Sequence, residues 1–252
     1  VITKSGTGSE FDLTSVQTNE ATNEKLLCMN PVFYPKFAIL DPTLTYTLPA
    51  DETAYGIADM MTHYFEQYFV LSQDTSCLDN VKEGMLRTII EHAPKAVKKL
   101  DDYTSRSNIM YAGAWSCSAQ NITGVIPEWS SHFIEHEITA LCDLNHGLGM
   151  AIIMPAWMKY VVKRIPGKFA QFAENIWGIE RKGRSDEEVG LEGINKLQDF
   201  WKSLGIPTTF TEAGVDTSIL PKAAKRAVRF GPLGTVAHLE EKDVLNILEL
   251  AK

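Results

Sequence analysis

Residues 51–69 read D-E-T-A-Y-G-I-A-D-M-M-T-H-Y-F-E-Q-Y-F, and this stretch decides the fold class of the chain. Its apolar side chains recur at steps of three and four residues, at Ile57, Met60, Met61, Tyr64, Phe65 and Tyr68. Residues with this spacing share one face of an α-helix, so the pattern predicts a helix over residues 52–69. Asp51 is the expected N-cap of this helix, with Glu52 in its first turn.

The same periodicity continues to the end of the chain. It predicts further helices over residues 78–100, 104–121, 128–141, 147–162, 167–177, 186–204, 217–230 and 240–251. Pro94 is expected to bend or interrupt the first of these. The order Gly205-Ile206-Pro207 is typical of a helix end.

The first fifty residues have a different character, because they are rich in Thr, Ser, Gly and Pro. Short β-like runs at 15–18 and 25–29 flank a polar turn at 19–24, and the apolar run 37–40 ends at Asp41-Pro42. These runs are typical of strands or a hairpin at the edge of a sheet. The expected fold class is therefore mainly α, with a β-containing segment over 1–50 and an all-helical domain over 51–252.

Composition excludes several classes of protein. The chain has 252 residues, 44% hydrophobic and 22% charged, which is ordinary for a folded soluble protein and excludes disorder, collagen and coiled coil as its main character. A net charge of −8 without a basic run disfavours nucleic acid as a partner. No apolar stretch reaches the roughly 18–20 residues of a membrane span. The four cysteines form no C-x-x-C pair, which predicts reduced thiols in a cytoplasmic protein.

Histidines cluster in two short segments. Asp59 and His63 are four residues apart on a predicted helix, and so are His132 and His136, with His146 ten residues later. Three imidazoles and one carboxylate form an ordinary ligand set for Zn²⁺ or Fe²⁺. The pattern therefore indicates a metal site, although a simple hydrogen bond on a helix face also explains the first pair by itself.

Two other interpretations remain open at this point. The segment His132-Phe-Ile-Glu135-His136 matches H-x-x-E-H, in which both histidines bind zinc and Glu135 is the general base of a hydrolase. That interpretation leaves Asp59, His63 and His146 without a role. The third possibility is a non-catalytic helical module whose histidines are structural.

The start of the chain contains a turn of small residues, Gly6-Thr7-Gly8-Ser9-Glu10. Such a turn lets backbone N–H groups approach a phosphate or a cofactor ring closely. It is not the dinucleotide-binding fingerprint, because Phe11 stands where the third glycine would be.

Several motifs occur together in a fixed order. They are T-x-x-G-T-G-S-E at 3–10, F-A-I-L-D-P and Y-T-L-P within 37–49, D-x-x-x-H-x-x-E-Q-Y at 59–68, H-x-x-x-H-E-x-T-A at 132–140 and N-H-G at 145–147. This combination resembles the iron-containing (group III) alcohol dehydrogenase family, and most closely its butanol dehydrogenase and aldehyde reductase branch. The resemblance implies a dehydroquinate synthase-like fold that is incomplete at its N-terminus.

The resemblance also implies an activity and a set of site residues. The activity is the interconversion of primary alcohols and aldehydes by metal-assisted hydride transfer with NAD or NADP. The implied ligands of a divalent metal (Fe²⁺ or Zn²⁺) are Asp59, His63, His132 and His146, and His136 would relay a proton near the nicotinamide. The implied cofactor contacts are Ile2, Thr3, Lys4, Ser5, Gly6, Thr14, Lys25, Leu44, Thr45, Tyr46, Thr47 and Leu48. Thr14 stands where relatives often carry Asn.

Members of that family begin with an α/β nucleotide-binding domain that carries a Gly-Gly-Gly-Ser phosphate loop, and no such loop precedes Val1. We therefore expect a piece of a longer protein: residues 1–50 would be the last strands of the nucleotide-binding domain, and 51–252 the complete helical metal-binding domain. The expected partner is a small alcohol or aldehyde, with no nucleic acid and no membrane, and the resemblance implies a homodimer for the full-length protein.

Overall fold

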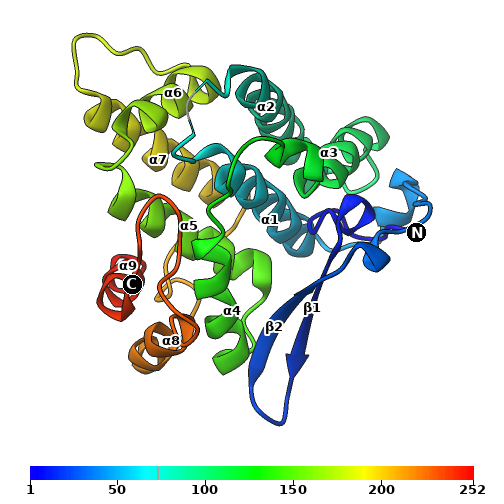
Figure 1. The fold of residues 1–252 in the computed structure, drawn as a ribbon. Coiled ribbons are helices and arrows are strands. Elements are labelled where there is room, and N and C mark those ends of the chain that lie inside the picture. The colour runs from blue at the N-terminus through cyan, green and yellow to red at the C-terminus, as the bar shows by residue number, and fades with distance from the viewer. Residues whose placement is uncertain (73) are drawn as a thin grey trace.

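The computed structural model describes residues 1–72 and 74–252, and helices dominate this part of the chain (Figure 1). The α-helices are α1 (Ala50–Tyr68), α2 (Ser76–Lys98), α3 (Tyr103–Ser116), α4 (Ser130–Cys142), α5 (His146–Val161), α6 (Pro166–Trp177), α7 (Asp186–Ser203), α8 (Leu220–Ala227) and α9 (Glu241–Leu250). The predicted all-helical domain over the larger part of the chain is confirmed.

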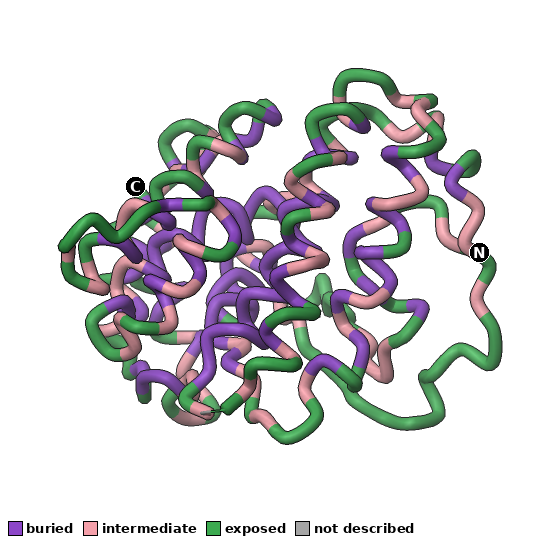
Figure 2. The backbone as a smooth tube through the Cα atoms, turned by 90° about the horizontal axis from the view of Figure 1, so that it is seen from above, coloured by how far each residue is buried: buried purple, intermediate pink, exposed green. Residues whose placement is uncertain are grey.

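Helix α1 lies in the centre of the molecule, in contact with α2, α3 and α5. Its apolar residues from Ile57 to Tyr68 are completely buried, and Figure 2 shows the buried segments gathered in the middle of the molecule. The helix predicted over 52–69 therefore exists, but its N-cap is Pro49 and not Asp51. Asp51 and Glu52 lie in the first turn, where the positive end of the helix dipole stabilises their negative charges.

Helix α5 passes beside α1 and is buried on all sides, as its run of apolar residues from 148 to 158 requires. Gly147 allows the close approach of the two helices. A Cβ atom at this position would lie 2.1 Å from the backbone oxygen of Tyr55, so no other residue fits without moving one helix.

The remaining helices pack around this pair. Helix α4 contacts α5 and α8, α6 packs along α7, and α9 closes the C-terminal end against α8 and α5 (Figure 1). Helix α2 runs through Pro94 without interruption, so the expected break at that proline is wrong. The helix predicted over 104–121 ends earlier, at Ser116, and a separate 3₁₀ turn follows over Ala119–Ile122.

The N-terminal segment contains one antiparallel hairpin, formed by β1 (Thr14–Asn19) and β2 (Glu24–Met29). Thr14 pairs with Met29 and Asn19 with Glu24, as the two β-like runs predict, and β2 lies against α4. The run Phe37–Leu40 was expected as a strand, and that expectation is wrong. Its described backbone contact is one hydrogen bond, from Ile2 N to Ile39 O at 3.1 Å, which is too little for a ladder.

Within the described ranges, we find no helix with the length and apolar character needed to cross a membrane.

Candidate metal centre

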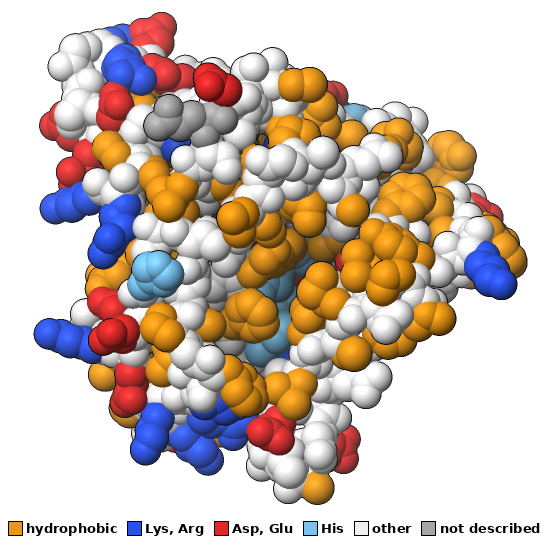
Figure 3. Space-filling view, in the orientation of Figure 1, with side chains coloured by type: hydrophobic (Ala, Val, Ile, Leu, Met, Phe, Trp, Pro, Cys, Tyr) orange, Lys and Arg blue, Asp and Glu red, His pale blue; other side chains and the backbone are white. Residues whose placement is uncertain are grey.

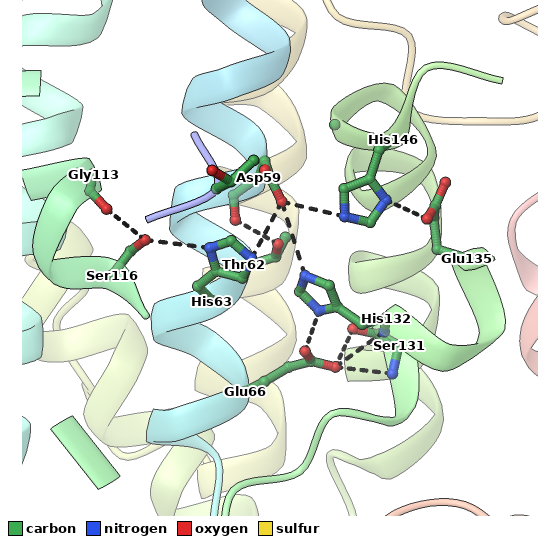
Figure 4. A network of polar contacts seen from close by, with 12 residues as sticks. Asp59, Thr62, His63, Glu66, Gly113, Ser116, Ser131, His132, Glu135 and His146 are labelled. Carbon is green, nitrogen blue, oxygen red and sulfur yellow. Dashed lines mark hydrogen bonds and ion pairs between the residues drawn. The ribbon is translucent and has the colours of Figure 1, made fainter. Parts of the chain in front are cut away.

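Three histidines from three helices surround one carboxylate oxygen (Figure 4). The Oδ1 atom of Asp59 on α1 lies 3.4 Å from Nε2 of His63, 3.8 Å from Nε2 of His132 on α4 and 3.5 Å from Nε2 of His146, the first residue of α5. Asp59 and His63 share a face of α1 because they are four residues apart. The chain thus brings together all four residues that the sequence analysis proposed as metal ligands.

Each of these imidazoles has a hydrogen-bond partner at its other nitrogen. Nδ1 of His132 contacts Oε2 of Glu66, and Nδ1 of His146 contacts Oε2 of Glu135. Nδ1 of His63 lies 3.2 Å from the Ser116 hydroxyl, which itself donates to the carbonyl oxygen of Gly113 at 2.7 Å. The Ser116 hydroxyl therefore accepts from His63, and an ionised carboxylate only accepts, so all three Nδ1 atoms carry the proton.

With Nδ1 protonated, each ring in its neutral form directs the lone pair of its Nε2 atom toward Asp59, which is itself an acceptor. Oδ1 of Asp59 and Nε2 of His132 are buried and have no hydrogen-bond partner among the described residues. Buried acceptors that converge without a donor are costly, and a cation satisfies all of them at once. One carboxylate oxygen and three imidazole nitrogens are also donors that Zn²⁺ and Fe²⁺ accept, so the residues present fit a divalent metal.

Charges in the site support the same conclusion. Burial alone would raise the pKa of Asp59, but His63, His146 and His132 lower it well below its ordinary value. Burial lowers the pKa of His63 to about 4, so this ring is neutral at pH 7. Burial also acts to lower the pKa of His132, yet the carboxylates of Glu66 and Asp59 together raise it to about 10, so without a metal this ring also carries a proton on Nε2. The site thus favours one positive charge beside Asp59, and a bound divalent metal would supply that charge in place of the proton.

Glu135, His136 and His146 form a second set whose potential ligand atoms lie within 4.8 Å of one another. A cation already occupies the neighbourhood of this set, because Lys25 Nζ lies 3.3 Å from Oε2 of Glu135 and 3.2 Å from Nδ1 of His146. His136 belongs to this set and not to that of Asp59, His63 and His132, whereas the H-x-x-E-H interpretation needs His132 and His136 on one zinc ion. His146 also belongs to this second set, but its Nε2 atom lies 3.5 Å from Oδ1 of Asp59. Glu135 is completely buried among hydrogen-bond donors, so the arrangement does not favour its role as a hydrolytic base.

A cavity of about 470 Å³ opens directly onto the four residues. Figure 3 shows histidine side chains at the bottom of a hollow whose walls are largely hydrophobic. Trp129, Phe133 and Ile122 line the cavity, and His136 faces it beside His146 at a ring-centroid distance of 5.6 Å.

The residues proposed as cofactor contacts fall into two groups. Thr14 and Lys25 on the hairpin line the cavity. Ile2, Thr3, Lys4, Ser5 and Gly6 run along α1: Ser5 lies against Gly56, and the position of a Cβ on Gly6 is 3.4 Å from Oδ2 of Asp59. Leu44, Thr45, Tyr46, Thr47 and Leu48 include a 3₁₀ turn that packs against α3. Among the described residues that line the cavity, these last two segments are absent.

Two side chains that contact the candidate ligands received no role from the sequence. Glu66 follows His63 by three residues, and Ser116 ends α3. A signal for Glu66 does exist, since H-x-x-E occurs both as His63/Glu66 and as His132/Glu135, although it also occurs at His238/Glu241 outside the site. No pattern points to Ser116, because its contact joins residues 53 positions apart.

Known proteins are similar to this chain over most of its length. The model of the Fe-containing alcohol dehydrogenase family, C-terminal, matches residues 53–252. The chain is 40% identical over 249 residues to a probable NADH-dependent butanol dehydrogenase 1 of Bacillus subtilis, covering 99% of this chain and 64% of that protein. It is 34% identical to the NADPH-dependent aldehyde reductase YqhD of Escherichia coli, covering 92% of this chain and 59% of the relative.

A solved structure shares the fold as well. The NADH-dependent butanol dehydrogenase A of Thermotoga maritima superimposes with a TM-score of 0.94 at 35% sequence identity, over 99% of this chain and 64% of that one. This chain therefore spans less than two thirds of the length of these relatives. The extent of the family match, together with the convergence of Asp59 and three histidines, leads to one conclusion: the chain belongs to the Fe-containing alcohol dehydrogenase family.

Proposed function

We propose that the full-length protein interconverts primary alcohols and aldehydes by hydride transfer with NAD or NADP. The observation that carries this proposal is the convergence of three imidazole Nε2 atoms on Oδ1 of Asp59, at 3.4–3.8 Å, at the bottom of a largely apolar cavity. The family match and the names of the relatives, which are butanol dehydrogenases and an aldehyde reductase, support it.

Asp59, His63, His132 and His146 would hold one divalent metal, Fe²⁺ or Zn²⁺. When bound, the metal supplies Lewis-acid polarisation of the substrate oxygen, and the nicotinamide supplies or accepts the hydride.

The chain's own residues would bind and orient the substrate. Trp129 and Phe133 give the cavity an apolar wall that accepts an alkyl chain and excludes water. His136 lines the same cavity, and burial lowers its pKa to about 3, so its ring is neutral at pH 7. We propose that His136 relays the proton between the substrate oxygen and water.

We propose the nicotinamide side of the site at the hairpin, where Thr14 and Lys25 line the cavity opposite α4. The segments 2–6 and 44–48 would contact other parts of the cofactor. In this proposal, residues 1–50 belong with the nucleotide-binding domain, and 51–252 form the helical domain that holds the metal.

The test measures bound metal and the reduction of a linear aldehyde such as butanal by NADH and NADPH, in the full-length protein. Asp59→Asn and His146→Ala are expected to lose metal and activity together. His238→Ala is the matched control, because this histidine is exposed and lies outside the site, and it should retain both.

A different pattern would favour another function. If His136→Ala releases the metal while Asp59→Asn retains it, the second ligand set is the one in use and the dehydrogenase proposal is wrong. A wild-type protein that binds no divalent metal would leave the histidines with a structural role alone.

A further inference from the structure

Two buried carboxylates connect the three helices of the site in a chain. Glu66 lies on α1, three residues after His63, and contacts His132 on α4. Glu135 lies on α4, three residues after His132, and contacts His146 on α5. Helices α1 and α4 thus each supply a histidine to the centre and a glutamate to the histidine of the next helix, and α5 supplies His146 (Figure 4).

Both glutamates are completely buried, and donors surround them. Oε1 of Glu66 accepts from the backbone N of Ser131 at 2.9 Å, the Ser131 hydroxyl at 2.5 Å and the backbone N of His132 at 3.3 Å. This leaves Oε2 for Nδ1 of His132. Glu66 therefore fixes the first turn of α4 and the ring of its histidine with one carboxylate.

Glu135 is held in a comparable way. Its Oε2 accepts from Nδ1 of His146 and from Lys25 Nζ at 3.3 Å, and its Oε1 contacts the hydroxyl of Thr139. The absence of a side chain at Gly149 leaves room for it, since a Cβ there would lie 2.6 Å from Oε1 of Glu135.

We propose that Glu66 and Glu135 are positioning residues, which hold the proton of His132 and of His146 on Nδ1 and so keep both Nε2 atoms free to bind the metal. This inference rests on the proposed metal site and goes beyond it, because neither glutamate is a ligand in the proposed set. Hydrogen bonds from metal-binding histidines to carboxylates orient the ring and raise its basicity, and their loss weakens metal affinity by about 10- to 100-fold.

Replacing glutamate by glutamine is expected to disturb the histidine ring more at position 66 than at position 135. In the wild-type protein, one oxygen of Glu66 accepts from the first turn of α4 and the other from Nδ1 of His132. A glutamine at position 66 has only one acceptor oxygen, and the backbone N–H of Ser131 still requires an acceptor. With that oxygen on Ser131, the amide NH₂ donates to Nδ1 of His132 and moves the ring proton to Nε2. Gln at position 135 can keep its oxygen on His146, since Thr139 can donate to the carbonyl of Leu144 at 3.1 Å and accept from the amide.

The experiment measures the Zn²⁺ dissociation constant of the purified protein by competition with a chromophoric chelator. Glu66→Gln is expected to weaken Zn²⁺ binding about 10- to 100-fold, and Glu135→Gln by clearly less. Glu83→Gln is the matched control: Glu83 on α2 is equally buried and accepts from Tyr68, Gln171 and Asn175 outside the site. This control should lose stability but keep the affinity of the wild-type protein.

Several outcomes would overturn the inference. They are a folded Glu66→Gln variant with wild-type affinity, a loss in Glu83→Gln equal to that in Glu66→Gln, or a larger loss in Glu135→Gln than in Glu66→Gln. Asp59→Asn separates the two proposals: if it loses metal while Glu66→Gln does not, the metal site stands and the positioning role is wrong. If neither variant loses metal, the proposed site itself is wrong.

A second measurement needs no variant and therefore does not depend on folding. In the zinc-loaded wild-type protein, the ¹⁵N spectrum of the histidine rings should show the proton on Nδ1 for His132 and His146. A proton on Nε2 of either ring would contradict the positioning role directly.

Discussion

Trp129 adopts a left-handed backbone conformation, with φ of 58°, immediately before α4. For a bulky side chain this conformation costs on the order of 1–2 kcal/mol and persists only where the surroundings enforce it. The result is that the indole stands edge-on against His132 at a ring-centroid distance of 5.3 Å and forms one wall of the cavity. The strained backbone thus positions the indole at the cavity where the substrate would bind.

Trp129→Ala should therefore widen the substrate site. We expect the ratio of kcat/KM for a branched or aromatic aldehyde to that for butanal to rise about tenfold or more, because lost contacts in an apolar pocket change discrimination by that order. Steady-state kinetics on the full-length protein measures the ratio. Phe230→Ala, at an exposed position outside the cavity, is the control and should leave the ratio unchanged. An unchanged ratio in Trp129→Ala would mean that the indole does not contact the substrate.

Lys82 on α2 is a second residue with an unusual environment. Its side chain is completely buried, its ammonium has no hydrogen-bond partner among the described residues, and burial lowers its pKa to about 8. Below pH 8 the folded protein holds the charged ammonium of Lys82 away from water, which lowers its stability. Between pH 8 and about 10 the unfolded state binds more protons than the folded state, so the free energy of unfolding rises with pH.

Lys82→Met should stabilise the protein at pH 7 by on the order of 2–3 kcal/mol, because it removes the buried charge and nearly conserves volume. This advantage over the wild-type protein should shrink between pH 8 and pH 10. Urea unfolding of both proteins at pH 7, 8.5 and 9.5 measures the difference. A difference that stays constant over this range would show that the Lys82 charge does not determine it.

The sequence predicts these residue-scale features unevenly. The four proposed ligands could be found because they belong to two short segments that contain pairs of metal-binding residue types at helical spacing. Asp59 and His63 are one such pair, four residues apart. Lys82 looks like any solvated lysine in the sequence, and its burial depends on helices that reach it from elsewhere. In the sequence, Met60, Met61 and Trp157 could equally line a pocket or fill the core, and all three are completely buried in the core.

At the scale of elements, the approach of α5 to α1 depends on Gly147. Ala at this position would place its Cβ 2.1 Å from the backbone oxygen of Tyr55, and no side-chain rotation relieves a clash with a carbonyl. Gly147→Ala should therefore push the start of α5 away from α1 and move His146 with it. We expect a loss of about 1–3 kcal/mol in stability and at least a tenfold loss in Zn²⁺ affinity.

Gly84→Ala on α2 is the matched control for Gly147→Ala. Gly84 is also helical, but nothing lies within 4 Å of an added Cβ, so the variant should gain about 0.5–1 kcal/mol from helix propensity. Chemical unfolding and a chelator competition measure both quantities. Equal behaviour of the two variants would show that the crossing of α1 and α5 can relax.

Helix boundaries were predicted well where a cap marks them. The helix expected over 186–204 runs from Asp186 to Ser203, and Ser185 and Glu188 form a capping box at its start. The break after Ser116 was missed because Cys117 and Ser118 carry no Gly or Pro signal. The run Phe37–Leu40 has the composition of a strand but lacks a partner strand in the described structure, and no local pattern reveals a missing neighbour.

At the scale of the whole molecule, a bound metal would join α1, α4 and α5. A ligand that binds only the folded state stabilises it by about 2.7 kcal/mol at 100 times its dissociation constant. For a chain of this size we expect EDTA to lower Tm by about 5–10 °C and added Zn²⁺ to restore it. Calorimetry or thermal fluorescence measures the shift, and Asp59→Asn should not respond to either reagent. A wild-type Tm that is insensitive to both would argue against a metal shared by three helices.

The central position of α1 has one more consequence. The helix that supplies the middle of the core also supplies Asp59 and His63, so correct assembly of the interior and readiness to take up the ion are a single event. A newly made copy with a misplaced interior would then lack the proposed metal site. The metal content of a purified batch would therefore report the fraction of correctly folded copies.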